Sequence, residues 1–436
     1  MNGGAALRAF AGNGRDYLKG ETHMEENRRP LDGVRVVELA TFIAAPSCAR
    51  CLADLGAEVI KVEAPGGDPL RYTAVNEGRP GGDLENTSFD LDNANKRGIC
   101  LNTKSPEGRE ALEKLIARAD VFITNVRQKS LVKSGLDYDT LKVKYPKLVM
   151  GYVTGYGEEG PDKDLPGFDF TAFFARAGIL GTLFDPEASP MLTVPGFGDH
   201  PVGMYLTNGI LAALYRARET GRGDKVTVSL LHAGIWAVSI MLQAAQYGMP
   251  ATRYPMSRRD TANPFNMVHK TSDNRWIQFS GPAYNAIYDR FVTALGREDL
   301  VGDARFYPQA NLQANLHTFY DILVSEVGKR PLAEWCERFK AADIPYAVAQ
   351  TWDELLCDEQ AWASHCFYKM HYPSGADRTL VRPPVMFRDT PLPDYRRGPY
   401  LGEQTEAILA ELGYSDEQIQ AMMAAGAAAH PPVKTE

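Results

Sequence analysis

The stretch from Pro195 to Gly203, which reads PGFGDHPVG, places a carboxylate where covalent chemistry is feasible. Gly196 and Gly198 precede Asp199, so a ligand can approach the main chain and backbone N–H groups can face a developing oxyanion. Pro201 suits the first turn of a helix, because its missing N–H has no partner there. This pattern makes Asp199 a candidate nucleophile. Spacing alone leaves a second interpretation open, in which Asp199 only caps the helix, a common position for Asp.

The elements that must position Asp199 follow a parallel α/β pattern, in which short β-branched runs alternate with helical periodicity. The first strand is not followed by G-x-G-x-x-G, so the usual dinucleotide site is not predicted. Ser105 and Pro106 predict the cap and first position of one helix. Strands are expected at 34–39, 58–63, 99–101, 121–124, 148–153, 226–230 and 277–279, and helices at 46–55, 105–116, 168–174, 201–220, 235–245, 284–295, 312–327 and 405–412.

A chain of 436 residues is too long for one ordinary core, so several domains are expected. Residues 1–30 lack periodicity and are expected to form a disordered extension, in which Met24 is an alternative start. The further boundaries expected are a large Rossmann-like domain at 31–218, a linker at 219–250, a small domain at 251–345, a returning linker at 346–410 and a C-terminal helix on the large domain at 411–436.

The composition excludes several classes of function. A net charge of −8 argues against general nucleic-acid or membrane-surface binding, and no run of about 18 apolar residues predicts a membrane span. No secretion signal is visible, and six cysteines in a chain of this length are few, so a cytoplasmic location is expected. Cys48 and Cys51 form a C-x-x-C, but Cys48 lies on the apolar stripe of a helix and no second ligand pair is nearby. We therefore predict no metal or redox site.

Four aromatic residues leave two interpretations open. Phe173 and Phe174 lie before Asp199, in a glycine- and proline-rich stretch of the chain, and Tyr205 and Trp236 lie on helices expected after it. They either line a pocket for an aryl group or fill the core, which is the commoner fate of such side chains.

Several blocks together are similar to one known family, the class III (formyl-CoA transferase-like) CoA-transferases. They extend from residue 31 over nearly the whole remaining chain, in family order. The blocks are LDGVRV (31–36), GAEVIKVE (56–63), NKR (95–97), GYG (155–157), PGFD (166–169), GFGD (196–199) and GRGDKV (221–226). Further stretches, EAPGGDPLR (63–71), GPDKDLPGFD (160–169) and QTWDELL (350–356), resemble the subgroup that activates (R)-2-hydroxy acids in amino-acid fermentation.

The resemblance implies roles for individual residues. Asp199 matches the catalytic carboxylate, with Gly198 stabilising oxyanions. Asp169 either positions groups nearby or is structural. The CoA contacts carry over to Thr41, Ala44, Leu101, Lys104, Asn125 and Lys133. Lys133 replaces an Arg of related enzymes, so it offers a point charge without the bidentate fork.

The resemblance also implies an activity. CoA would move from an acyl-CoA such as cinnamoyl-CoA to an (R)-2-hydroxy acid such as (R)-phenyllactate, or to (R)-2-hydroxyisocaproate, through aspartyl anhydride and aspartyl-CoA intermediates. Ile43 stands where formyl-CoA transferase has Gln, and no glycine-rich loop occurs in the small domain, so formyl or oxalyl specificity is disfavoured. Phe168 stands where an α-methylacyl-CoA racemase, a rival of the same fold, has its catalytic His. A non-catalytic CoA-binding subunit is a second rival, disfavoured by the intact Asp199.

The fold implied is α/β, with a Rossmann-like large domain, a smaller α/β domain and an interlocked homodimer. The expected ligands are CoA thioesters as substrates, with no permanently bound cofactor and no metal. A 2-hydroxyacyl-CoA dehydratase is a further partner that this subgroup suggests.

Overall fold

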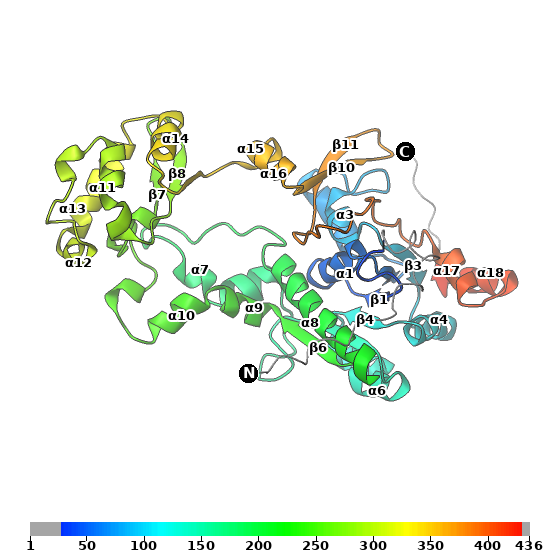
Figure 1. Cartoon of the computed structure of the whole chain (residues 1–436). Helices are drawn as coiled ribbons and strands as arrows, with labels where there is room; N and C mark the ends of the chain where they lie inside the picture. The colour runs from blue at the N-terminus through cyan, green and yellow to red at the C-terminus, as the bar shows by residue number, and fades with distance from the viewer. Residues whose placement is uncertain (1–27, 430–436) are drawn as a thin grey trace, which may run out of the picture. The chain divides into compact units, whose positions relative to one another are not determined.

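The structure, a computed structural model, describes residues 28–429 and forms two compact units (Figure 1). Of the described residues, unit 1 contains 28–152, 203–226 and 369–429, and unit 2 contains 153–202 and 227–368. The chain therefore leaves unit 1 and returns to it twice. The domain boundaries expected from the sequence stay a prediction. The alternative start at Met24 and nearly all of the expected extension at 1–30 lie outside the described residues.

The central element of unit 1 is a seven-stranded sheet of order β12-β3-β2-β1-β4-β5-β6. β1 is parallel to β2 on one side and to β4 on the other, and β3 and β5 continue the parallel arrangement. The strand order thus reverses between β1 and β4, which is where open α/β sheets usually bind ligands. The strands are β1 (Arg35–Leu39), β2 (Glu58–Glu63), β3 (Arg97–Leu101), β4 (Val121–Thr124), β5 (Val149–Thr154), β6 (Lys225–Ser229) and β12 (Ala428–Ala429), the last antiparallel to β3.

Helices cover this sheet because each buries an apolar stripe. Leu112 and Ile116 of α4, Ile408 of α17 and Met422 of α18 belong to one buried cluster with the strands, and α17 and α18, drawn in red, lie beside α4 in Figure 1. Nearly every residue of α1 is buried. The helices are α1 (Ala44–Asp54), α2 (Leu70–Thr73), η1 (Ala74–Glu77), α3 (Thr87–Asn93), α4 (Pro106–Ala117), α5 (Gln128–Ser134), α6 (Tyr138–Lys144), α8 (Asp199–Thr220), α17 (Thr405–Glu411) and α18 (Asp416–Ala424), and a hairpin joins β10 (Phe367–His371) to β11 (Asp377–Val381).

Unit 2 contains a compact aromatic core. Phe265 stacks on Tyr284 and contacts Phe291, while Trp335 donates its indole N–H to the Val327 carbonyl at 2.8 Å. A three-stranded antiparallel sheet, β7 (Val268–Lys270), β8 (Trp276–Phe279) and β9 (Tyr346–Val348), supports this core. The other elements are η2 (Asp169–Arg176), α7 (Ile179–Thr182), α9 (Leu230–Ala237), α10 (Ser239–Ala245), η3 (Pro250–Thr252), η4 (Arg258–Asp260), η5 (Pro264–Asn266), α11 (Tyr284–Leu295), η6 (Glu298–Leu300), α12 (Gln309–Leu312), η7 (Gln313–Asn315), α13 (Leu316–Val327), α14 (Leu332–Ala341), α15 (Trp352–Leu356) and α16 (Glu359–Ala363).

Several sequence predictions are confirmed and others are wrong. β2 and α11 have the predicted bounds, and Ser105 caps α4 with Pro106 at its start. The helix predicted at 235–245 is two helices separated at Val238, and α8 begins at Asp199, two residues earlier than expected. The aromatic helix expected at 168–174 is the π-helix η2. α14 and the hairpin at 367–381 were not expected, whereas α18 lies within the range expected for a C-terminal helix, 411–436.

Candidate active site

Asp199 is the first residue of the 22-residue helix α8. The turn that leads into it is tight: the His200 N–H donates to the Gly196 carbonyl at 3.0 Å, and the Val202 N–H donates to the Gly198 carbonyl at 3.3 Å. Gly196 has a φ of 85°, a left-handed conformation that favours glycine. The start of a long helix favours an anion there, because the helix dipole is positive at that end. Asp199 therefore lies where the start of a long helix favours a negative charge.

Asp169 supports this turn from η2 in the same unit. Its Oδ2 accepts the Gly196 N–H at 2.9 Å and its Oδ1 accepts the Phe170 N–H at 2.8 Å. Burial raises the pKa of Asp169 and outweighs the lowering by the backbone N–H groups of Phe170, Gly196 and Gly198 and by nearby His200. The Asp169 carboxylate is thus engaged with the loop that carries Asp199.

Gly198 is required for close packing. A Cβ at this position would lie 2.5 Å from Cγ of Phe173, whose ring is buried. The Gly198 backbone N–H also donates to the Asp169 carboxylate. An oxyanion would compete with Asp169 for this N–H, and the expected oxyanion role of Gly198 stays a prediction.

The aromatic candidates separate into two groups. Phe173 and Phe174 are buried and meet edge to face with centroids 5.4 Å apart, so they fill the core. Tyr205, Trp236 and Phe197 are exposed, and the Phe197 ring lies 5.3 Å from that of Phe174. Sequence reasoning did not single out Phe197 as an aromatic candidate, although its place between two glycines next to Asp199 was visible.

Thr41 and Asn125 are brought together in unit 1. The Thr41 N–H donates to Asn125 Oδ1 at 3.1 Å, and Asn125 Nδ2 donates to the Thr41 carbonyl at 2.8 Å. Thr41 follows β1 and Asn125 follows β4, so this reciprocal pair bridges the point where the strand order reverses. The location is the one at which parallel sheets usually bind nucleotide-containing ligands.

The other predicted CoA contacts lie on neighbouring segments at the same edge of the sheet. Ala44 begins α1, Lys104 is exposed just before α4, and Lys133 is exposed in the last turn of α5. Leu101 ends β3 with a buried side chain, and its backbone pairs with Ala428 of β12. That burial does not favour a direct contact between Leu101 and CoA, and the ligand roles of all these residues stay predictions.

Sequence reasoning missed a buried charge network next to this edge. Lys61 Nζ lies 2.7 Å from Glu38 Oε1 and 2.9 Å from Asp68 Oδ2, and Lys96 Nζ lies 2.6 Å from Glu38 Oε2. All four side chains are fully buried. A signal was present: Glu38 and Lys61 occupy adjacent parallel strands, and strands of that kind are buried on both faces, so opposite charges there predict an internal pair.

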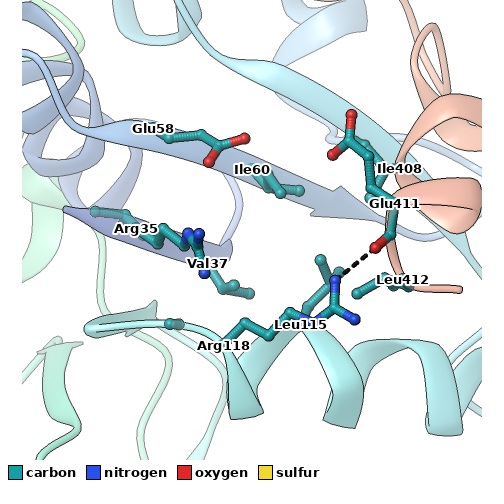
Figure 2. A pocket seen from close by; sticks show the side chains of 11 residues that line it. Arg35, Val37, Glu58, Ile60, Leu115, Arg118, Ile408, Glu411 and Leu412 are labelled. Carbon is teal, nitrogen blue, oxygen red and sulfur yellow. Dashed lines mark hydrogen bonds between the residues drawn. The ribbon is translucent and has the colours of Figure 1, made fainter. Parts of the chain in front are cut away.

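A cavity of about 260 Å³ lies elsewhere in unit 1 and is shown in Figure 2. Arg35 and Glu58 begin β1 and β2, so this cavity lies at the amino ends of the strands, away from the edge that carries Thr41 and Asn125. Arg118 closes one side by donating to the Glu411 carbonyl at 2.5 Å. The cavity therefore does not belong to the candidate active site.

Cys48 lies on the buried face of α1, as the apolar stripe of that helix predicts, while the absence of a metal or redox site stays a prediction. Cys48 is buried and accepts a hydrogen bond from Thr207 Oγ1 at 3.3 Å, and burial raises the pKa of its thiol. Burial also raises the pKa of Cys51 to about 12. Thiols held protonated are poor nucleophiles and metal ligands. Within residues 28–429, no cluster of His, Cys, Asp and Glu side chains is arranged to hold a metal ion.

Residues 31–405 match the model of CoA-transferase family III. The chain is a family III CoA-transferase. It is 53% identical over 398 residues to a cinnamoyl-CoA:phenyllactate CoA-transferase of Clostridium sporogenes, with 91% of this chain and 97% of the relative covered. It is 42% identical over 389 residues to an (R)-2-hydroxy-4-methylpentanoate CoA-transferase of Clostridioides difficile, with 89% and 97% covered.

Solved structures agree with this membership. A CaiB/BaiF family protein from Brucella suis superposes with a TM-score of 0.74 at 27% identity, covering 88% of this chain and all of that one. A Mycobacterium tuberculosis protein gives a TM-score of 0.75 at 25% identity, covering 87% of this chain and 99% of the other. The expected α/β fold of this family is thereby confirmed. Across residues 28–429, the structure contains no helix of the length and apolarity needed to cross a bilayer.

Proposed function

We propose that this CoA-transferase moves CoA from an aryl acyl-CoA of the cinnamoyl type to an (R)-2-hydroxy acid such as (R)-phenyllactate, with Asp199 as the nucleophile. The observation that carries the proposal is the 53% identity to a transferase named for these substrates, over nearly the full length of both chains. The position of Asp199 at the start of α8 supports the proposal, because a helix start favours an anionic side chain and a carboxylate can act as a nucleophile toward a thioester.

The first half-reaction loads CoA onto the enzyme. The Asp199 carboxylate attacks the thioester carbonyl, the C–S bond breaks, and CoA leaves as the thiolate while a mixed anhydride forms. The thiolate then attacks the aspartyl carbonyl of that anhydride. The donor acid leaves as a carboxylate, and Asp199 carries CoA as a thioester.

The second half-reaction reverses these steps with the acceptor. The carboxylate of the hydroxy acid attacks the aspartyl thioester, which expels CoA thiolate and forms a second anhydride. The thiolate attacks the acceptor's acyl carbonyl, and the Asp199 carboxylate leaves unchanged. One thioester replaces another, so the exchange is close to balanced in energy, and we propose that no resident cofactor takes part.

The residues of unit 1 supply binding energy for the CoA portion. In this proposal the backbone around Thr41, Ala44 and Asn125 contacts the CoA chain, while Lys104 and Lys133 attract its phosphates. Binding of the CoA portion, far from the thioester, holds the thioester in position for the reaction. Asp169 acts on the loop of Asp199 as a positioning residue through its contact with Gly196.

A second acceptor has its own support. The 42% identity to an (R)-2-hydroxy-4-methylpentanoate CoA-transferase favours a branched aliphatic substrate pair as the alternative. A racemase activity is disfavoured, because the residue before Asp169 is Phe168 and not a His that could transfer a proton.

We further propose a cytoplasmic homodimer that hands its product to a 2-hydroxyacyl-CoA dehydratase. Helix α10 supports the dimer, because none of its residues, including Ile240 and Leu242, is buried within a single chain. Apolar surface of this extent is typical of a protein interface. The dehydratase follows from the product, since an (R)-2-hydroxyacyl-CoA is the substrate that such chemistry consumes.

The nucleophile is tested by trapping. The full-length protein is incubated with cinnamoyl-CoA and hydroxylamine, and the modified peptide is located by mass spectrometry. A hydroxamate at Asp199 is expected, and Asp199→Ala should lose transfer while it still binds CoA by calorimetry. Asp199→Asn is a near-isosteric control that lacks the nucleophilic carboxylate. Modification of Asp169 or substantial turnover by Asp199→Ala would overturn the assignment.

The substrates are tested separately. Cinnamoyl-CoA and 4-methylpentanoyl-CoA are each offered with phenyllactate, 4-hydroxyphenyllactate, indolelactate and 2-hydroxy-4-methylpentanoate. A higher kcat/KM for the aryl pairs is expected. A clear preference for the aliphatic pair would replace the proposed substrates while leaving the role of Asp199 intact.

A further inference from the structure

Buried charged side chains bind the loop that joins β1 to α1 at two backbone positions, and the first turn of α1 at a third. Lys61 Nζ donates to the Ala40 carbonyl at 3.1 Å, Asp68 Oδ1 accepts the Phe42 N–H at 3.0 Å, and Lys96 Nζ donates to the Pro46 carbonyl at 2.9 Å. Glu38 joins the two lysines, because each of its oxygens contacts one ammonium group. We call Glu38, Lys61, Asp68 and Lys96 the charge network.

The charge network is balanced but costly. Two carboxylates face two ammonium groups, all with fully buried side chains, so the net charge is zero. Removing such groups from water is unfavourable, and well-packed apolar residues often stabilise a fold equally well. Stability alone is therefore a weak explanation for the network, whereas directed contacts to particular backbone atoms are something apolar residues cannot provide.

The backbone that receives these contacts is in an uncommon conformation. Phe42 has a φ of 64°, in the left-handed region that residues with a Cβ rarely adopt. Ile43, at the cap of α1, supplies no side-chain hydrogen bond to the helix start. From the other side, Asn125 holds Thr41 by its two hydrogen bonds. The loop is thus fixed from both sides in a shape that its own sequence does not favour.

Asp68 is itself held in place by a second ion pair. Glu63 Oε2 accepts the Asp68 N–H at 2.8 Å, and Glu63 also binds Arg71 through two contacts of 2.6 and 2.8 Å. Asp68 Oδ1 accepts the Leu70 N–H as well, at 3.0 Å. Because the Asp68 carboxylate is itself anchored, it holds the Phe42 N–H in one position. A binding loop needs such support from surrounding residues to keep its shape.

We propose that the charge network, acting through Asp68, is a positioning device that presets residues 40–44 for the CoA thioester. This inference rests on the proposed function, which assigns CoA contacts to Thr41 and Ala44. The loop lies where the strand order reverses, so a preset backbone there reduces the ordering that binding would otherwise require. Asp68 and Lys61 contact the loop backbone, so in this proposal the network acts on binding, whereas the chemistry belongs to Asp199.

The test uses two substitutions of Asp68 and one control in the full-length protein. Asp68→Ala removes the Phe42 contact and the Lys61 ion pair, whereas Asp68→Asn keeps an acceptor for the Phe42 N–H and loses the charge. The control is Asp90→Asn, because Asp90 is an equally buried carboxylate of unit 1 that binds Tyr372 and the Gly398 N–H instead of the loop. Thermal unfolding establishes that each variant is folded.

Three readouts separate positioning from a general structural role. The Kd of CoA is measured by calorimetry, kcat and KM by steady-state transfer, and the amide exchange of residues 40–44 by mass spectrometry. For Asp68→Ala we expect about a tenfold or larger rise in Kd and KM, kcat at saturation within about threefold of wild type, and faster exchange confined to the loop. Asp68→Asn should lie between Asp68→Ala and wild type, and Asp90→Asn should leave the Kd unchanged.

Other outcomes overturn the inference. A wild-type Kd in folded Asp68→Ala would do so, as would an equal loss of affinity in Asp90→Asn. If Asp68→Ala does not fold, Asp68→Asn decides: wild-type Kd together with wild-type exchange at 40–44 refutes the positioning role. If wild type itself does not bind CoA, the proposed function fails as well. If wild type binds CoA and the Asp68 variants are unaffected, only the positioning role fails.

Discussion

Asp169 Oδ2 accepts the N–H of Gly196 at 2.9 Å, and this contact ties η2 to the turn three residues before Asp199. The two partners are 27 positions apart in the sequence. Oδ1 of the same carboxylate accepts the Phe170 N–H, so Asp169 also fixes its own helix start. Asp169 therefore stabilises the approach to α8, and its effect on catalysis should be indirect.

Replacing Asp169 with Ala should lower kcat about 10- to 100-fold, because the turn that aims Asp199 loses its anchor. Asp169→Asn should fall between Ala and wild type, since one amide oxygen can accept only one of the two N–H groups well. Steady-state transfer assays give kcat, and the hydroxylamine trap should still label Asp199 in both variants. The matched control is Asp162→Ala, which removes a half-buried carboxylate of the same unit that pairs with Arg176 at 2.8 Å. Wild-type kcat in Asp169→Ala would contradict the positioning role.

Gly198→Ala should reduce both stability and kcat, because the new Cβ would lie 2.5 Å from Cγ of the buried Phe173 ring. Overpacking of this kind costs about 1–3 kcal/mol. The double variant Gly198→Ala, Phe173→Leu should recover part of the loss by making room for the methyl group. Melting temperature and kcat of the two single variants and the double variant form a cycle. If the effects of the two single substitutions simply add in the double variant, the Gly198→Ala methyl group does not clash with the Phe173 ring.

The strands of the central sheet were predictable because their signal is local. The residues of β2 form a short β-branched run, and α4 has its cap and proline within two adjacent positions, Ser105 and Pro106. The break between α9 and α10 at Val238 was missed, because the apolar pattern continues across it. The strand β12 was missed because it is two residues long and its partner, β3, lies more than 300 positions earlier.

The candidate site was predictable only in part. Spacing alone could not separate a nucleophile from a cap at Asp199, because both put an Asp before a helix; family resemblance separated them. The pairing of Thr41 with Asn125 spans 84 positions, and that of Glu38 with Lys96 spans 58, so neither leaves a local pattern. Such contacts depend on the order of the strands in the sheet, which cannot be derived from local sequence patterns.

His269 should make unit 2 sensitive to acid. Burial lowers the pKa of this imidazole to about 4, with nearby Arg258 adding to the lowering and the Pro264 carbonyl opposing it. Its ring lies between Phe279 and Tyr320, and Nδ1 has no hydrogen-bond partner within residues 28–429. In the unfolded chain the same group titrates near 6.5. The folded state therefore keeps its full stability above pH 6.5 and loses about 3 kcal/mol as the pH falls to 4.

The measurement is the thermal midpoint of the full-length protein between pH 7 and pH 4. His269→Gln should flatten this dependence relative to wild type, because the substitution removes a group that takes up a proton on unfolding. His317→Gln is the control, since His317 is exposed and pairs with Asp260 at 2.6 Å. Parallel pH curves for wild type and His269→Gln would disprove the assignment.

Helix α10 should form part of a dimer interface, and Ile240→Glu should weaken the dimer. Ile240 is 81% exposed in the single chain, and the nearby Tyr247 is exposed to the same extent. A charge introduced into a desolvated apolar contact costs several kcal/mol, so the dissociation constant of the dimer should rise by about 100-fold or more.

Val143→Glu is the matched control. Val143 is 78% exposed on α6 in unit 1, so this variant places the same charge at an equally exposed apolar residue outside α10. Light scattering after size exclusion, over a dilution series from micromolar to nanomolar, should give a dimer for wild type and Val143→Glu and a monomer for Ile240→Glu at the lower concentrations. A wild-type protein that is monomeric and active at every concentration would refute the dimer, whereas an unchanged dimer in Ile240→Glu would place the interface elsewhere on the chain.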